Sequence, residues 1–204
     1  MLRFVYALEK NEALDAGSLR VEEFDAFEAA DGADHGVAVA GRRCDDLPAC
    51  ARAIESGARW AVYRPVAGWG EVVSQLNALP GAGLLLIEPW TLCATPRELW
   101  LFWESLTRPN VRLAWPAEWG VKTGQTPAGV IPVLNLRLGA VRVTDGQAAT
   151  IDFAKRLAGI GFDGYFIVDP PASEDRLGEA RKIVEIVRDI IQPRKPVKAV
   201  AKKA

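Results

Sequence analysis

The sequence predicts a single α/β domain in which parallel strands, seven to eight of them, form a compact or incomplete barrel. Short apolar runs alternate with amphipathic helical segments along the chain. Most of these runs are apolar on both faces, as is typical of parallel strands covered on both sides. Half of the residues are hydrophobic, which is ordinary for a globular domain. A doubly wound open sheet is the alternative, although the glycine-rich and Walker A motifs of its common nucleotide-binding versions are missing.

Seven short β-rich runs are expected to form strands. They are Phe4–Leu8, Gly36–Ala40, Trp60–Arg64, Gly83–Ile87, Val111–Trp115, Ala140–Thr144 and Tyr165–Val168. Short connections between alternating strands and helices imply right-handed crossovers. Seven or eight such units suggest a TIM-type (β/α) barrel, for which 204 residues is a short chain.

Helices are expected between these runs, at 47–57, at 70–79, after residue 95 and after residue 173. The third of them has the clearest beginning. Thr95 is suited to the N-cap, Pro96 to the first helical position, and Glu98 completes a capping box. Ser173 is expected to cap the last helix, which carries one long apolar stripe.

The expected organisation is one domain, residues 1–192, followed by a basic C-terminal tail, residues 193–204, which is expected to be disordered. The tail carries five basic residues and no acidic residue, so the rest of the chain holds 20 basic and 26 acidic residues, a net charge of −6. An acidic body with a short basic end is not typical of a nucleic-acid-binding protein. Nucleic acid is therefore not an expected partner.

The cysteines and the hydropathy pattern indicate in which cellular compartment the protein is expected. Cys44, Cys50 and Cys93 form neither a disulfide framework nor a zinc-binding spacing. No stretch approaches the roughly 20 apolar residues that a membrane-spanning helix needs. We therefore expect a protein without membrane segments in the reducing cytoplasm.

Acidic residues and arginines follow several of the expected strands. In a parallel barrel, functional side chains gather at the C-terminal ends of the strands. The residues at those ends are Arg42, Arg43, Arg64, Glu88, Glu118, Arg142, Asp145 and Asp169. This mixture is the most functional-looking feature of the sequence.

Several of these segments resemble the xylose-isomerase-like TIM barrels, the family of sugar phosphate isomerases and epimerases. Residues 161–169 read Gly-Phe-Asp-Gly-Tyr-Phe-Ile-Val-Asp, similar to the last strand of the family, which ends in a metal-binding glutamate. Residues 83–89, Gly-Leu-Leu-Leu-Ile-Glu-Pro, are similar to its middle strand, which also ends in a glutamate ligand. Residues 140–145 resemble the strand that carries His-x-x-Asp, and the ordered match covers about residues 50–191.

The resemblance implies a divalent metal, Mn, Zn or Mg, held by two glutamates, an aspartate and a histidine. In this sequence Glu88 matches the first glutamate, Asp169 stands at the second, and Arg142 stands where the histidine is expected. Residues 115–119 lack the aspartate, and the single histidine, His35, lies elsewhere. We therefore expect no metal, with Arg142 able to replace the ion as a fixed positive charge. If a metal were retained, Glu88 and Asp169 would hold it.

Three functions fit this pattern. A divergent isomerase or epimerase would use Glu88 or Asp169 as a base, with Arg64 and Arg142 binding a sugar or sugar phosphate. A catalytically inactive barrel would serve as a ligand-binding or regulatory module, and a structural relic would act through protein contacts. In any of these cases the carboxylates can simply pair with the arginines. An enzyme needs at least one of the two carboxylates, Glu88 or Asp169, to be unpaired, whereas the other two functions tolerate full pairing.

Overall fold

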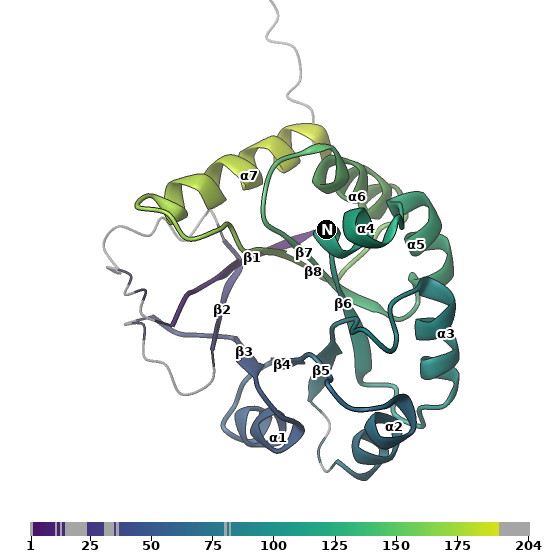
Figure 1. The fold of residues 1–204 in the computed structure, drawn as a ribbon. Helices are drawn as coiled ribbons and strands as arrows, with labels where there is room; N and C mark the ends of the chain where they lie inside the picture. Colours follow the sequence, from purple (N-terminus) through teal and green to yellow (C-terminus); the bar gives the residue numbers. More distant parts are fainter. Residues whose placement is uncertain are drawn as a thin grey trace, which may run out of the picture.

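The computed structural model is a closed barrel of eight parallel strands, which follow one another around the ring in chain order (Figure 1). The structure describes residues 2–10, 12, 14, 24–30, 35, 37–79, 81 and 83–191. The ring closes where β1 pairs in parallel with β8. The predicted TIM-type barrel is therefore confirmed, and it has all eight strands.

The strands are short, four to six residues each. They are β1 (Arg3–Ala7), β2 (Ala26–Ala30), β3 (Gly41–Cys44), β4 (Trp60–Tyr63), β5 (Leu84–Ile87), β6 (Val111–Pro116), β7 (Leu138–Val143) and β8 (Tyr165–Val168). The sequence did not predict β2, and it placed the next strand at 36–40 rather than at β3. Both strands carry charged residues that look unsuited to a barrel wall. Glu28 in β2 and Arg43 in β3 are tolerated because they meet opposite charges: Glu28 pairs with Arg142 and Arg43, and Arg43 also pairs with Asp169.

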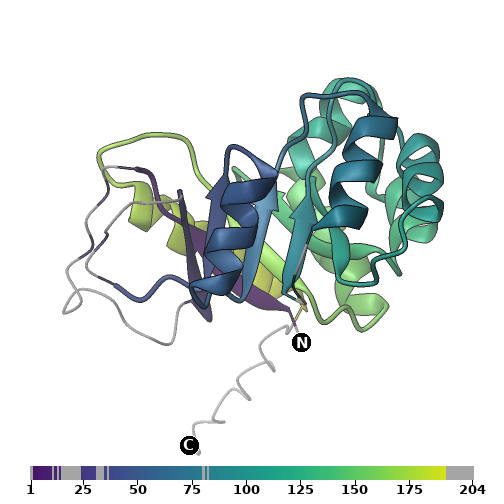
Figure 2. The ribbon, with the colours of Figure 1, turned by 90° about the horizontal axis from the view of Figure 1, so that it is seen from below.

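The helices lie outside the strands, roughly along them (Figure 2). They are α1 (Leu47–Glu55), α2 (Trp69–Ala78), α3 (Pro96–Glu104), α4 (Ala117–Thr123), α5 (Pro127–Leu134), α6 (Ala148–Gly159) and α7 (Arg176–Ile191). Each strand from β3 to β8 is followed by at least one helix. The described residues between β1 and β3 contain no helix.

Helix beginnings follow the local sequence in one case and depart from it in another. The capping box of α3 is confirmed, because Thr95 Oγ1 accepts from the Glu98 backbone at 3.2 Å while Glu98 accepts from the Thr95 backbone at 2.8 Å. The predicted cap at Ser173 is wrong. α7 begins at Arg176, and Asp175 accepts from the Gly178 backbone at 3.0 Å. Asp175 provides the contact because it lies directly before the helix.

Two apolar clusters lie on the two faces of the barrel wall. The larger joins strands to helices, and the smaller contains strand residues only, so the smaller one fills the interior. Trp60 lies in the interior and is completely buried. Gly41 makes room for it, because a Cβ there would lie 2.1 Å from the Trp60 ring. The barrel interior around Trp60 is therefore filled by described side chains.

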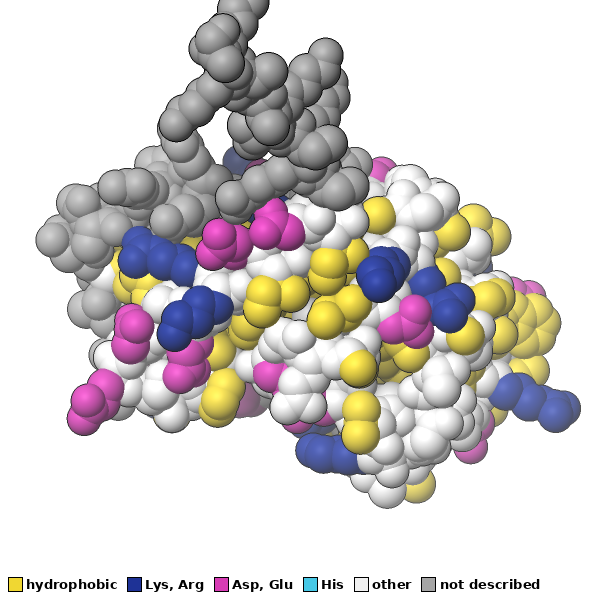
Figure 3. All heavy atoms as spheres, turned by 90° about the horizontal axis from the view of Figure 1, so that it is seen from above, with side chains coloured by type: hydrophobic (Ala, Val, Ile, Leu, Met, Phe, Trp, Pro, Cys, Tyr) yellow, Lys and Arg dark blue, Asp and Glu magenta, His cyan; other side chains and the backbone are white. Residues whose placement is uncertain are grey.

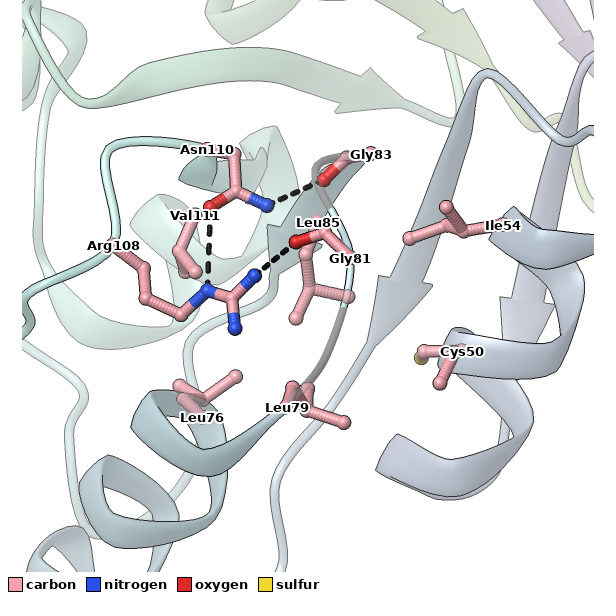
Figure 4. Close-up of a pocket in the computed structure, with 11 residues that line it drawn as sticks. Cys50, Ile54, Leu76, Leu79, Gly81, Gly83, Leu85, Arg108, Asn110 and Val111 are labelled. Atoms are coloured by element: carbon pink, nitrogen blue, oxygen red, sulfur yellow. Dashed lines mark hydrogen bonds between the residues drawn. The ribbon is translucent and has the colours of Figure 1, made fainter.

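A small cavity of about 20 Å³ lies where β5 and β6 begin (Figure 4). Asn110 Nδ2 donates to the Gly83 carbonyl at 2.6 Å across it, and Arg108 donates to the Gly81 carbonyl. The cavity has room for about one water molecule. It is a packing feature of the N-terminal end of the barrel, and a sugar cannot enter it.

The predicted tail, residues 193–204, lies outside the described residues. None of the helices in the described part of the chain is long and apolar enough to cross a membrane. On the face that Figure 3 shows, Lys and Arg side chains lie among Asp, Glu and hydrophobic side chains. The described part of this face therefore presents no broad patch of a single charge.

Candidate functional site

A buried arginine lies at the centre of the barrel mouth. Arg142, near the end of β7, is only 7% exposed and donates to three carboxylates. Its Nη2 lies 2.6 Å from Glu28 Oε1, its Nη1 2.9 Å from Asp169 Oδ2, and its Nε 3.1 Å from Glu88 Oε1. We call Glu28, Glu88, Arg142 and Asp169 the ionic layer. It joins side chains from four different strands or strand ends.

The barrel geometry explains why these side chains meet. Parallel strands end at one edge of the barrel, and residues at those ends converge on its axis. Glu88 directly follows β5, and its N–H donates to the Tyr63 carbonyl at 3.0 Å. Asp169 directly follows β8, and its backbone N–H donates to the Val143 carbonyl at 2.8 Å. These backbone hydrogen bonds extend the pairing of the strands by one residue and set the position from which each carboxylate side chain projects.

Two further arginines lie at the rim of the ionic layer. Arg43, in β3, donates from Nη1 to Asp169 Oδ2 at 3.3 Å and from Nη2 to the Leu8 carbonyl at 2.8 Å. Arg64, after β4, donates to Glu88 Oε2 from Nε at 2.9 Å, and its Nη2 lies 2.6 Å from the same oxygen. The Arg64 side chain is 56% exposed, whereas that of Glu88 is 8% exposed. Arg64 thus connects the buried layer with solvent.

A second buried arginine holds the ionic layer from the side of α7. Arg176 donates to Asp169 Oδ1 at 2.6 Å and to the Pro170 carbonyl at 2.8 Å. It also donates to the Ala7 carbonyl at 2.6 Å and to Glu12 Oε2 at 2.7 Å. These bonds connect the beginning of α7 with the end of β1 and the segment after it.

The charges in the ionic layer stabilise one another. Burial alone would lower the pKa of Arg142, but the attraction of Glu28, Glu88 and Asp169 is stronger in sum and raises this pKa above its ordinary value. The second oxygen of Glu28 accepts from Trp60 Nε1 at 3.1 Å. Both oxygens of each of the three carboxylates are therefore engaged by described residues. None of these three carboxylates is unpaired in this arrangement.

The structure brings all four predicted site residues, Arg64, Glu88, Arg142 and Asp169, into one connected network. Sequence reasoning missed Glu28. The one sequence feature that could have indicated it is that Glu28 is the single charged residue of an otherwise apolar run, Ala-Phe-Glu-Ala-Ala.

Three other residues behave differently from their sequence context. Arg176 was also missed, because an arginine in a first helical turn ordinarily faces solvent. Glu118 does not pair within the layer: it is half-buried on α4, with its Oε2 4.0 Å from Lys122 Nζ. His35 is buried, and its Nδ1 lies 2.5 Å from the Glu12 carbonyl oxygen.

The residues at the mouth do not fit the divalent metal that the family resemblance implies. A cation would need the oxygens of Glu28, Glu88 and Asp169, but the guanidinium of Arg142 already binds all three. Within the described ranges, no three His, Cys, Asp or Glu side chains are grouped so as to hold a metal ion. The positive charge that a metal would provide is supplied here by an arginine side chain.

The fold and this layer define the class: a (β/α) barrel with its polar centre at the C-terminal ends of the strands. The sequence matches no protein-family model and no curated protein. Among solved structures, the chain is similar to D-psicose 3-epimerase from Clostridium cellulolyticum H10, with a TM-score of 0.70 and 12% identity over 93% of this chain and 99% of that one.

An L-ribulose 3-epimerase gives a TM-score of 0.67 at 16% identity, over 96% of this chain and 100% of that one. A sugar phosphate isomerase/epimerase from Parabacteroides distasonis gives 0.62 at 12% identity, over 93% and 94%. The predicted resemblance to xylose-isomerase-like barrels is thereby confirmed at the level of the fold. At such low identity it is the fold alone that these structures share with this chain.

Stability is expected to fall above about pH 9, because two buried acids keep their protons in the folded state. Burial, with the nearby charge of Glu98, raises the pKa of Cys93 from 9.0 to about 12. Burial and a hydrogen bond to Glu12 raise the pKa of Tyr6 well above 10.0. In the unfolded chain both groups lose their protons at lower pH. Each group therefore lowers the free energy of unfolding by about 1.4 kcal/mol for every pH unit above the pKa that it has in the unfolded chain.

Urea unfolding across this alkaline range tests the expectation. Cys93→Ala should remove the part of the loss that begins near pH 9 and leave the part that begins near pH 10. A free energy of unfolding that stays constant up to about pH 11 would contradict it.

Proposed function

We propose that the protein binds a sugar or a sugar phosphate at the C-terminal ends of its strands, above the ionic layer. The single observation that carries the proposal is Arg64, a guanidinium that is 56% exposed beside a buried carboxylate. An arginine in this position can contact an anionic group from solvent while it keeps its place at the rim. Similarity in fold to sugar epimerases supports a carbohydrate as the class of ligand.

Binding without catalysis is the form of this function that the geometry favours. A divergent isomerase or epimerase would need Glu88 or Asp169 as a base, and a base must reach the substrate proton with a free lone pair. Arg64 and Arg142 engage Glu88, while Arg142, Arg43 and Arg176 engage Asp169. Catalysis would therefore require an arginine to leave a carboxylate when the ligand binds. Binding without catalysis corresponds to an inactive barrel that serves as a ligand-binding or protein-interaction module, and the divergent isomerase or epimerase is the second candidate function.

Isothermal titration with fructose 6-phosphate, fructose and inorganic phosphate tests the binding proposal. We expect the sugar phosphate to bind more tightly than either of the other two, because it combines hydroxyl contacts with an anionic group. Arg64→Met should weaken its binding by about 10- to 100-fold, the value of one or two charge-assisted hydrogen bonds. Arg156→Met, at an exposed pair on α6, is the matched control. Absence of binding by all three probes at millimolar concentration would reject the proposal.

Proton exchange in deuterated water separates the two forms of the function. An isomerase or epimerase of this chemical class removes a proton next to a carbonyl, so it exchanges that proton with solvent. We expect the bound sugar phosphate to show no deuterium incorporation by nuclear magnetic resonance. Incorporation that is lost in Glu88→Gln would instead establish the enzyme.

A further inference from the structure

The barrel mouth contains a cation that belongs to the chain itself. The Arg142 guanidinium lies between Glu28 Oε1, Glu88 Oε1 and Asp169 Oδ2, at 2.6, 3.1 and 2.9 Å. Three carboxylates from three directions around one positive centre is the arrangement by which proteins hold divalent ions. Here the centre is planar, carries one charge and is covalently attached to β7.

The surrounding charges explain how three acids are held together with a single positive charge at their centre. Arg64 and Arg176 each engage one of the same carboxylates from the outside, and Arg43 engages two, Asp169 and Glu28. The three acids thus meet four arginines, and Arg176 also pairs with two further acids, Glu12 at 2.7 Å and Glu9 at 3.6 Å. A divalent ion added to the intact layer would be repelled by these arginines and would have to displace Arg142.

We propose that Arg142 is a built-in substitute for a divalent cation, and that Glu28, Glu88 and Asp169 form a latent metal site which opens when the positive charge of this arginine is removed. The natural protein is then independent of metal at this position, whatever ligand it binds. The inference stands apart from the proposed sugar binding, since it depends only on the contacts of Arg142. Glu28, which the sequence did not single out, is the third acidic ligand.

Replacement of Arg142 by histidine is the direct test. Arg142→His removes the guanidinium and adds an imidazole beside three carboxylates, a donor set suited to Co²⁺ and Zn²⁺. Arg142→Lys is the matched control, because it shortens the fork but keeps a positive charge at the centre. Visible absorption of Co²⁺, titrated into chelator-treated protein, reports binding without any assay of activity.

We expect Arg142→His to bind Co²⁺ at least about 100-fold more tightly than the wild type, because removing a fixed positive charge at the centre ends a strong repulsion. Arg142→Lys should remain as weak as the wild type. Glu28→Gln or Glu88→Gln in the Arg142→His background should abolish most of the gain. Saturating Zn²⁺ should raise the melting temperature of Arg142→His and leave that of the wild type unchanged.

Two results would overturn the proposal. A folded Arg142→His protein that binds Co²⁺ no better than Arg142→Lys would show that the three carboxylates do not form a metal site. Wild-type protein that binds Co²⁺ at a site lost in Glu88→Gln would show that Arg142 does not stand in for the ion. The second experiment uses the natural arginine, so it tests whether Arg142 stands in for the ion even if the histidine variant fails to fold.

Discussion

Replacement of Arg142 by methionine is expected to lower the free energy of unfolding by about 3–5 kcal/mol, the usual cost of removing one partner from a buried ion pair. Glu28 accounts for most of this loss, because its side chain is completely buried and the substitution removes its nearest cation, Arg142. Methionine fills much of the volume of the arginine stem, so the change reports on charge more than on packing. Urea unfolding at neutral pH measures it.

The control for this prediction is an arginine outside the barrel. Arg156 Nε lies 2.8 Å from Asp152 one helical turn away, and both side chains are at least 40% exposed. Arg156→Met should cost less than about 0.5 kcal/mol, because exposed pairs on a helix contribute little. Equal costs for Arg142→Met and Arg156→Met would mean that the ionic layer does not stabilise the barrel.

Arg176→Met is expected to cost about 2–4 kcal/mol, since it leaves buried acceptors without their donor. Arg176 is only 6% exposed, and its guanidinium is bound by two backbone carbonyls as well as by Asp169 and Glu12. Asp169 retains Arg142 and Arg43, which is why the expected effect is smaller than that at Arg142.

Arg176→Lys distinguishes charge from geometry. A lysine keeps the positive charge but cannot reach acceptors on several sides at once, so we expect it to recover less than half of the loss. Hydrogen exchange should show faster opening of β1 and of the beginning of α7 in both variants, because Arg176 connects them. Full recovery by lysine would show that charge alone matters at this position.

The sequence was sufficient for the barrel wherever strands are apolar on both faces. β4, β5, β6, β7 and β8 appear in the sequence as short runs made mostly of aliphatic and aromatic residues, because such strands are buried between the barrel interior and the helices. It was not sufficient for β2 and β3. Glu28 and Arg43 break the apolar pattern there, and the partners that make their burial possible come from distant parts of the chain.

The same division holds for the candidate site. The sequence by itself determined that Glu88, Arg142 and Asp169 stand at strand ends, since strand ends and residue identities are local properties. Only the tertiary structure decided that one guanidinium binds all three acids and that Arg176 and Glu28 complete the network. Residues 28, 88, 142 and 169 are far apart in the chain, and closure of the barrel brings them within hydrogen-bond distance of one another. Charges so placed must be paired because water cannot solvate them, and the pairing follows from the closed ring of strands.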